Sequence, residues 1–287
     1  MKSERSFDRS VEDVGNIQNM EHFNLTVPDQ QLAALFYVTG LGFTRDPYID
    51  FGTFNMWINA GEQQFHLPKS DAQKFRGTIG VVIPQHDDLK RRLNGIERWM
   101  DGTEYTWEEN GDCIDVTCPW GNAIRVHQPD DDNGMALGIA YGDMQVPAGT
   151  SAGIVSFYEQ IFDTPAEKID DNTGTYAKVA MGYNQVFRFR ETDHDIDDYD
   201  GHHIAIYVSN FSRPHNALVE RGLITEESDQ HQYRFQSIID PDTGNELAEI
   251  EHEVRSLHHP MKRRNLVNRN ASQTFGNYRQ GRDVFVP

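Results

Sequence analysis

The chain has 287 residues and a formal net charge of −19, which is enough for one large domain or two of ordinary size. A charge this negative repels phosphate backbones, so nucleic acid is excluded as an expected partner. No apolar run approaches the roughly 20 residues of a membrane span, and the polar start MKSERSFDRS lacks the apolar core of a signal peptide. We therefore expect a cytoplasmic protein with no membrane partner; the oligomeric state stays open.

The cysteines and the distribution of charge give two further expectations. The cysteines, Cys113 and Cys118, are too few for a disulfide framework and are expected to be reduced thiols. Short acidic runs are expected to be solvated loops; they are Asp130–Asp132, Asp193–Asp200 and Glu226–Asp229. The segment after His259 is basic instead, and we expect it to lie back on the acidic body or against a second subunit.

An internal repeat organises the chain. A strand, an amphipathic helix and further strand-like runs recur at Met20–Pro68, Gly77–Gln128, Met135–Thr192 and Gly201–Ser256. A unit of about 55 residues cannot bury both faces of its own sheet, so the units must pair. We predict an α+β fold in which four βαβββ modules form two half-open barrels. The predicted divisions are an arm at 1–19, modules one and two at 20–130, modules three and four at 135–256, and a basic tail at 257–287.

The elements follow from apolar periodicity. In the first half we predict strands at Glu21–Val27, Phe43–Tyr48, Phe54–Asn59, Gln63–Leu67, Thr78–Ile83, Glu104–Glu108, Cys113–Cys118 and Ala123–His127, with helices after Pro28 and Pro84. In the second half we predict a strand near Leu137, helices at Ala152–Phe162 and Pro214–Gly222, and strands at Tyr176–Met181, Gln185–Arg190, His203–Val208, Tyr233–Ile239 and Leu247–Arg255.

Strand alternation decides which side chains enter the cleft of each barrel, because successive residues point to opposite faces. Apolar neighbours mark the packed face, so the opposite face of modules one and four carries His22, Gln64, His66, His203, Glu249, Glu251 and Glu253. His202 and His252 fall on the packed face. Two histidines and a carboxylate form the facial set of non-haem Fe(II), and a fourth ligand, His66 or Gln64, would move the site toward the Zn or Ni type.

The ligand candidates indicate how the modules pair. The corresponding positions hold no metal alone: module two offers Thr78, Arg125 and His127, and module three offers Gly138 or Ala140 together with Phe187 or Arg188. Pairing in chain order would split the candidates between two incomplete sites. We therefore favour pairing module one with module four, which unites the ligands. Modules two and three then form a metal-free barrel in which Arg125 and Arg188 suggest an anion pocket.

These segments resemble the vicinal oxygen chelate superfamily, which includes glyoxalase I, extradiol dioxygenases and bleomycin-binding proteins. The resemblance rests on EHFNLTVPD at Glu21–Asp29, QFHLP at Gln64–Pro68 and HHIAIYV at His202–Val208. The last module looks most like an extradiol dioxygenase, in which a histidine precedes an Asp-Pro-x-Gly turn and a ligand glutamate. Here His231 precedes DPDTGNELAEIE at Asp240–Glu251, which leaves Glu249 or Glu251 as the carboxylate.

The resemblance implies a small-molecule substrate and three candidate functions. The first is an Fe(II) oxygenase in which His22, His203 and Glu249 hold iron and His231 or Tyr233 shuttles protons. The second is a glyoxalase-like isomerase or lyase that uses Zn, Ni or Mn, with His66 as a fourth ligand and Glu251 as the base. The third is a binding protein without catalysis. Three ligands and an O₂-sensitive metal favour the oxygenase, four ligands and a redox-inert metal favour the isomerase, and the absence of tight metal binding favours the binder. We place the oxygenase first.

Overall fold

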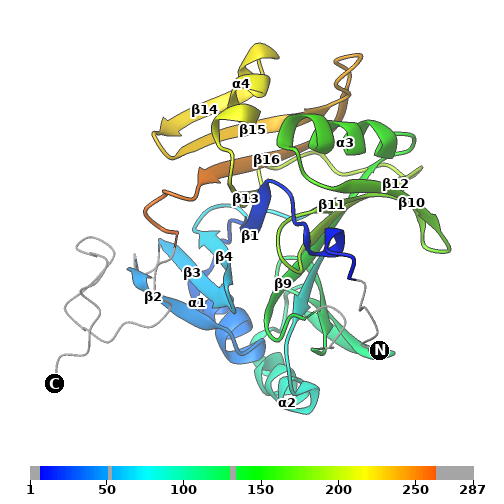
Figure 1. The fold of residues 1–287 in the computed structure, drawn as a ribbon. Coiled ribbons are helices and arrows are strands. Elements are labelled where there is room, and N and C mark those ends of the chain that lie inside the picture. The colour runs from blue at the N-terminus through cyan, green and yellow to red at the C-terminus, as the bar shows by residue number, and fades with distance from the viewer. Residues whose placement is uncertain (1–6, 51–53, 130–133, 263–287) are drawn as a thin grey trace, which may run out of the picture.

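A computed structural model describes residues 7–50, 54–129 and 134–262, and they form two large sheets with helices packed between them (Figure 1). Each sheet has eight strands. The order in the first sheet is β14 (Ile224–Asp229), β15 (Gln232–Ile239), β16 (Glu246–Ser256), β13 (His203–Val208), β1 (Ile17–Asn24), β4 (Gln63–Pro68), β3 (Asn55–Ala60) and β2 (Thr44–Asp50). Modules one and four therefore share this sheet.

The second sheet joins modules two and three in the same pattern. Its order is β10 (Ala166–Asp171), β11 (Gly174–Ala180), β12 (Val186–Thr192), β9 (Gly138–Pro147), β5 (Gly77–Val82), β8 (Ala123–His127), β7 (Cys113–Thr117) and β6 (Thr106–Asn110). Both the predicted fold class and the preferred module pairing are confirmed. In each sheet, one antiparallel pair at the centre joins the two modules, β1 with β13 and β5 with β9.

The apolar faces of the two sheets enclose one core, which holds the helices. The helical segments are η1 (Ser10–Glu12), α1 (Gln30–Ala34) with its π-helical continuation η2 (Leu35–Gly40), α2 (His86–Ile96), η3 (Glu97–Trp99), α3 (Ser151–Phe157) with its continuation η4 (Tyr158–Phe162), and α4 (Ser212–Glu220). Helix α3 contacts strands of both sheets. Phe23 of β1 stacks on Phe187 of β12 with ring centroids 6.4 Å apart. This core fixes the parity of the strands, so their polar residues face outward into the two concave clefts.

Two strands were not predicted, and one predicted loop is wrong. Strands β10 and β14 are edge strands with mostly exposed side chains and sequences rich in acid, AEKIDD and ITEESD. Charge on an exposed edge discourages pairing with other chains and removes the apolar alternation that marks a strand. The run Glu226–Asp229, expected to be a solvated loop, therefore belongs to β14.

The ends of the chain also differ from expectation. Strand β1 begins at Ile17, so the last residues of the predicted arm are part of the central strand. The predicted acidic loop at Asp130–Asp132 lies outside the described residues, as does the basic tail from residue 263 onward. Among the described helices, none is long and apolar enough to cross a membrane.

Candidate metal centre

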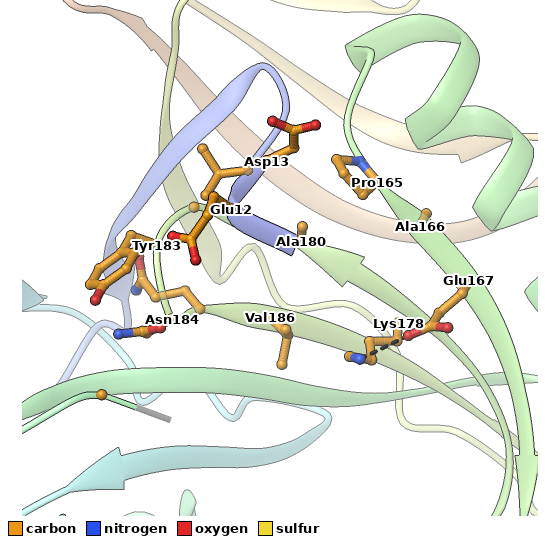
Figure 2. A pocket seen from close by; sticks show the side chains of 14 residues that line it. Glu12, Asp13, Pro165, Ala166, Glu167, Lys178, Ala180, Tyr183, Asn184 and Val186 are labelled. Atoms are coloured by element: carbon orange, nitrogen blue, oxygen red, sulfur yellow. Dashed lines mark hydrogen bonds and ion pairs between the residues drawn. The ribbon is translucent and has the colours of Figure 1, made fainter. Parts of the chain in front are cut away.

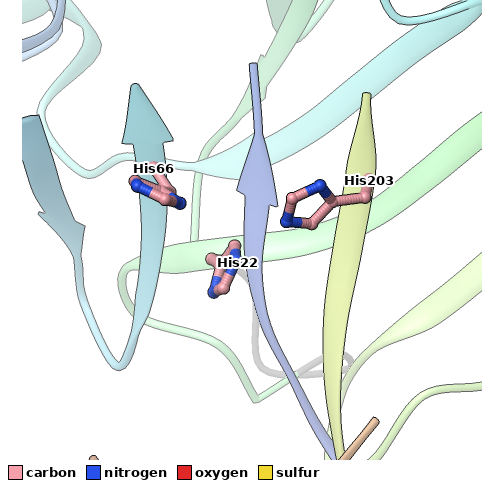
Figure 3. A group of neighbouring side chains, drawn as sticks. All are labelled: His22, His66 and His203. Atoms are coloured by element: carbon pink, nitrogen blue, oxygen red, sulfur yellow. The ribbon is translucent and has the colours of Figure 1, made fainter. Parts of the chain in front are cut away.

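Three histidines from three adjacent strands meet on the concave face of the first sheet. His66 lies on β4, His22 on β1 and His203 on β13, and their rings converge in Figure 3. One ring nitrogen from each lies within 4.8 Å of the others. The ring of His22 is 5.7 Å from that of His66 and 5.8 Å from that of His203, centroid to centroid. The predicted convergence of these side chains is present in the structure.

The imidazoles carry an unsatisfied bonding capacity. The Nε2 atoms of His22, His66 and His203 are all buried, and none of them has a hydrogen-bond partner among the described residues. A buried polar atom without a partner costs roughly 1–3 kcal/mol, so three of them at one point need an explanation. A divalent metal ion accepts lone pairs from neutral imidazoles at such a point. The donor set therefore fits a metal.

Burial keeps two of these rings in the form that binds metal. The pKa of His66 and the pKa of His203 are both lowered well below the usual value for histidine, mainly by burial and further by the neighbouring His22. The guanidinium groups of Arg234 and Arg255 act in the same direction. Neutral imidazole is the species that ligates, because a protonated ring has no free lone pair.

The ring of His22 is held from behind. Its Nδ1 lies 3.1 Å from Glu21 Oε2, and Glu21 is itself bound by Arg255 and by the hydroxyl of Tyr207. A carboxylate behind a ligating histidine fixes its tautomer and leaves Nε2 for the metal. Trp57 closes the other side by stacking on His66 at 3.9 Å, with its ring edge-to-face with that of His22 at 4.9 Å.

The pairing of the strands points to Glu253 as the fourth position. Asn24 lies opposite both His66 and His203, while His22 lies opposite Ala205. The approximate twofold axis between β1 and β13 therefore exchanges His22 with His203. Since Ala205 lies opposite Glu253 on β16, the same exchange takes His66 to Glu253.

The contacts around His203 separate the two nearest glutamates. Glu253 is buried, with Oε2 3.7 Å from Nε2 of His203. Glu251 lies on the other side of the ring, with Oε1 3.3 Å from Nδ1. Arg234 donates to both carboxylates at 2.6 Å. Burial raises the pKa of Glu251 above its usual value, although Arg234 opposes this.

Other predicted residues lie away from the histidines. Glu249 accepts a hydrogen bond from Gln236 and lines a separate cavity with Arg76 and Tyr199. His231 is in the turn between β14 and β15, where its carbonyl accepts from Ser256. Tyr233 is buried in the apolar core, with its ring 5.0 Å from that of Phe211. Parity explains the last position, because Arg234 next to it takes the cleft face of β15.

Gln64, the alternative fourth ligand, has other partners. Its side-chain nitrogen donates to Asp46 at 2.9 Å and also contacts Asn59. His202 and His252 lie on the packed face as predicted. His202 bonds Asp200 at 2.7 Å, and His252 bonds the hydroxyl of Tyr158 at 2.7 Å.

Sequence reasoning assigned no part in the metal centre to four groups that adjoin it, which are Asn24, Trp57, Arg234 and Glu253. The offset between the ligands was the available signal. His66 pairs two residues beyond His22, and repeating that offset in module four reaches Glu253 rather than Glu251.

A wide surface cavity of 780 Å³ lies elsewhere, between the N-terminal segment and strands β10 to β12. Figure 2 shows its lining, which includes Glu12, Asp13, Tyr183 and the ion pair between Lys178 and Glu167. None of the predicted metal ligands lines this cavity, so it is separate from the metal centre.

Comparisons with known proteins agree with this architecture. A putative dioxygenase from Bacillus subtilis subsp. subtilis str. 168 superposes with a TM-score of 0.59 at 14% identity, covering 91% of this chain and 89% of that one. Glyoxalase I from Zea mays superposes with a TM-score of 0.58 at 15% identity, covering 83% and 92%. No family model and no curated protein sequence matches. The paired module architecture and these two structures together give the chain the fold of the vicinal oxygen chelate superfamily.

Proposed function

We propose that the chain is a divalent-metal-dependent enzyme whose ion is held by His22, His66, His203 and Glu253. The observation that carries the proposal is the meeting of three buried, unpartnered imidazole nitrogens beside a buried carboxylate. Glu21 orients His22 from behind, and Glu251 does the same for His203. Trp57 forms one wall of the site.

The reaction class follows from this set. A divalent ion bound there would act as a Lewis acid and stabilise negative charge on two adjacent oxygens of a substrate. Glu251 supplies the acid–base group, because burial raises the pKa of this carboxyl. Its Oε1 contacts His203 and Arg234, whereas Oε2 makes no hydrogen bond or ion pair with any described residue and is left to take a substrate proton. We infer that Glu251 takes a proton from the carbon that bears the substrate hydroxyl and returns it to the neighbouring carbonyl carbon, while the hydroxyl proton passes from the first oxygen to the second. The net result is an isomerisation with no change in the number of protons.

Four protein ligands favour this isomerase or lyase reading over the oxygenase that the sequence placed first. His66 adds a third histidine to the two histidines and one carboxylate of a facial Fe(II) site, and so fills a position that an oxygenase keeps open. The similarity in fold to the maize glyoxalase I is in keeping with the isomerase. The oxygenase stays as a second candidate, since a named dioxygenase superposes over 91% of the chain.

The test is metal content together with two activity assays. The protein is purified anaerobically and its metals are measured by elemental mass spectrometry, beside His203→Ala and the control His215→Ala. His215 is on α4, where it pairs with Glu227. We expect about one nickel, zinc or manganese per chain in the wild type and the control, and almost none in His203→Ala.

Activity then separates the two enzyme candidates. Exchange of a carbon-bound proton with deuterium from D₂O, in α-hydroxycarbonyl substrates, reports the isomerase step. Uptake of O₂ with catechols reports the oxygenase. Stoichiometric iron with O₂ uptake would replace the isomerase by the oxygenase. No tight metal after reconstitution would overturn both and leave a binding protein.

A further inference from the structure

The second barrel has a cleft at the place where the first has its histidines. The pairing of the strands shows which residues occupy equivalent positions in the two barrels. His22 lies opposite Gln64 on β4, and Thr78 lies opposite Ala123 on β8. Two residues further along, Asn24 faces both His66 and His203, while Gly80 faces both Arg125 and Tyr141. Thr78, Arg125 and Tyr141 therefore occupy the positions of His22, His66 and His203. Tyr141 corrects the sequence-based choice of Gly138 or Ala140.

The position of Glu253 in the first barrel also has an equivalent in the second, and the two residues carry opposite charges. Glu253 lies opposite Ala205, which is two residues beyond His203. In the second barrel, Arg188 lies opposite Asp143, which is two residues beyond Tyr141. The buried carboxylate is thus replaced by a guanidinium. All four equivalents, Thr78, Arg125, Tyr141 and Arg188, line one cavity of 500 Å³.

The hydrogen bonds leave one of the three arginines of this cavity available. Arg125 uses Nε and Nη2 on Asp115, at 2.7 and 2.8 Å, and Arg190 uses the same atoms on Asp143, at 2.9 and 2.8 Å. The guanidinium of Arg188 makes no hydrogen bond to any described residue, and its nearest carboxylate oxygen, on Asp143, is 3.9 Å away. It keeps all five N–H donors for another partner.

Contacts with neighbouring groups fix the positions of Tyr141 and Arg188. A Cβ added at Gly80 would lie 2.1 Å from the ring of Tyr141, so the absence of a side chain there lets the ring lie against the strand. The guanidinium carbon of Arg188 lies 4.4 Å from the centroid of that ring, a cation–π contact. The hydroxyl of Tyr141 is fixed by His127 at 2.9 Å.

We propose that this cleft is a second binding site, which takes a small anion bearing a carboxylate or phosphate group. Arg188 receives the anion through its planar set of donors, and the hydroxyl of Thr78 and the free Nη1 of Arg125 complete the contact. Arginine suits both oxyanions, so their shared chemistry defines the ligand. The site is independent of the metal centre and of the function proposed for it.

The experiment is calorimetric titration of the full chain with inorganic phosphate and, separately, with acetate, at constant ionic strength and with the uncharged chelator 1,10-phenanthroline present to keep the metal centre empty. Either or both ions are expected to bind to the wild type, and the tighter one identifies the ligand class. Arg188→Gln should weaken that binding at least tenfold, and Arg188→Lys should lie between, because lysine keeps the charge but loses the planar pair of donors.

Three further variants guard the interpretation. Thr78→Val keeps the shape of the side chain and removes one donor, so a weaker but measurable loss is expected even if Arg188→Gln disturbs folding. Arg213→Gln makes the same chemical change on α4, where Arg213 pairs with Asp163, and should bind as the wild type does. His203→Ala should also bind normally. Equal affinity in Arg188→Gln and wild type, or no binding of either ion at about 10 mM, would overturn the proposal.

Discussion

The two barrels of this chain have the same strand arrangement and differ in the charge of the side chains that line their clefts. At corresponding strand positions the first has three imidazoles and a carboxylate, and the second has a threonine, a tyrosine and two arginines. The sheets set where the side chains meet, and only the residue types decide whether a cation or an anion fits there. A duplicated fold can therefore diverge in ligand charge without any change in topology.

The partners behind the two sets differ in the same way. In the first barrel Glu21 and Glu251 lie behind the histidine rings, and the Nε2 atoms have no hydrogen-bond partner among the described residues. In the second, Asp115 and Asp143 neutralise two arginines, and the guanidinium of Arg188 makes no hydrogen bond to any described residue. Each cleft thus keeps part of its bonding capacity unused, which is the property expected of a binding site rather than of a packed core.

The largest expected effect tests the roles of the two glutamates. Glu253→Gln should weaken metal binding by at least about a hundredfold, because it removes a ligand, whereas Glu251→Gln removes an outer partner and should cost about tenfold. Competition with a chromogenic chelator measures both affinities. Equal losses, or a larger loss in Glu251→Gln, would show that the twofold relation between His66 and Glu253 misassigns the fourth ligand.

A second substitution probes the shape of the anion cleft. Gly80→Ala places a Cβ against the ring of Tyr141 and should destabilise the protein by about 1–3 kcal/mol, the cost of overpacking. Gly95→Ala is the matched control. Gly95 lies in α2 with nothing within 4 Å of the added atom, so alanine there should stabilise by roughly 0.5–1 kcal/mol. Urea unfolding gives both values, and a neutral Gly80→Ala would mean that the ring of Tyr141 is not held there.

The smallest expected effect is on the pH dependence of stability, which involves a histidine of the first barrel. Burial, with Arg255 in support, lowers the pKa of His259 to about 4, beside Tyr207 of the first barrel. A histidine whose pKa is depressed on folding contributes stability that is complete above about 6.5 and is lost as the pH falls toward 4, because the unfolded chain binds the proton first.

We expect the free energy of unfolding to drop by at most about 2 kcal/mol between pH 7 and pH 5 from this group. His259→Gln should flatten that part of the profile, as measured by urea unfolding at each pH. Arg188→Gln, which changes the second barrel and not the surroundings of His259, should leave the slope unchanged. An unaltered slope in His259→Gln would assign the acid sensitivity to other groups.

Most of the fold was predictable because the apolar parity of each strand was clear. Alternation placed His22, His66 and His203 in one cleft and sent His252 to the core, and the distribution of ligands was enough to pair module one with module four. The edge strands β10 and β14 were not predictable in this way. Their charged residues remove the alternation that identifies a strand, and pairing with β11 and β15 defines them instead.

The details of the site depend on register, which the sequence does not contain. The choice among Glu249, Glu251 and Glu253 turns on which residue of β16 lies opposite Ala205. Likewise, Tyr141 was missed because the start of β9 does not reveal which of its residues faces Gly80. Tyr233 entered the core because its neighbour Arg234 took the cleft face, a choice made by packing against Phe211.

The central pairing of β1 with β13 has a consequence for how the protein is made. His22 and His66 emerge early in synthesis, while His203 and Glu253 come from the last third of the chain. Until β13 has been translated, one edge of β1 has no partner, and that edge can pair with other chains. Because its central contact joins distant parts of the sequence, the first barrel closes late and slowly. The second barrel joins modules that are adjacent in the chain, so it can fold first. Strand β1 can then pack against the folded second barrel before β13 has been translated.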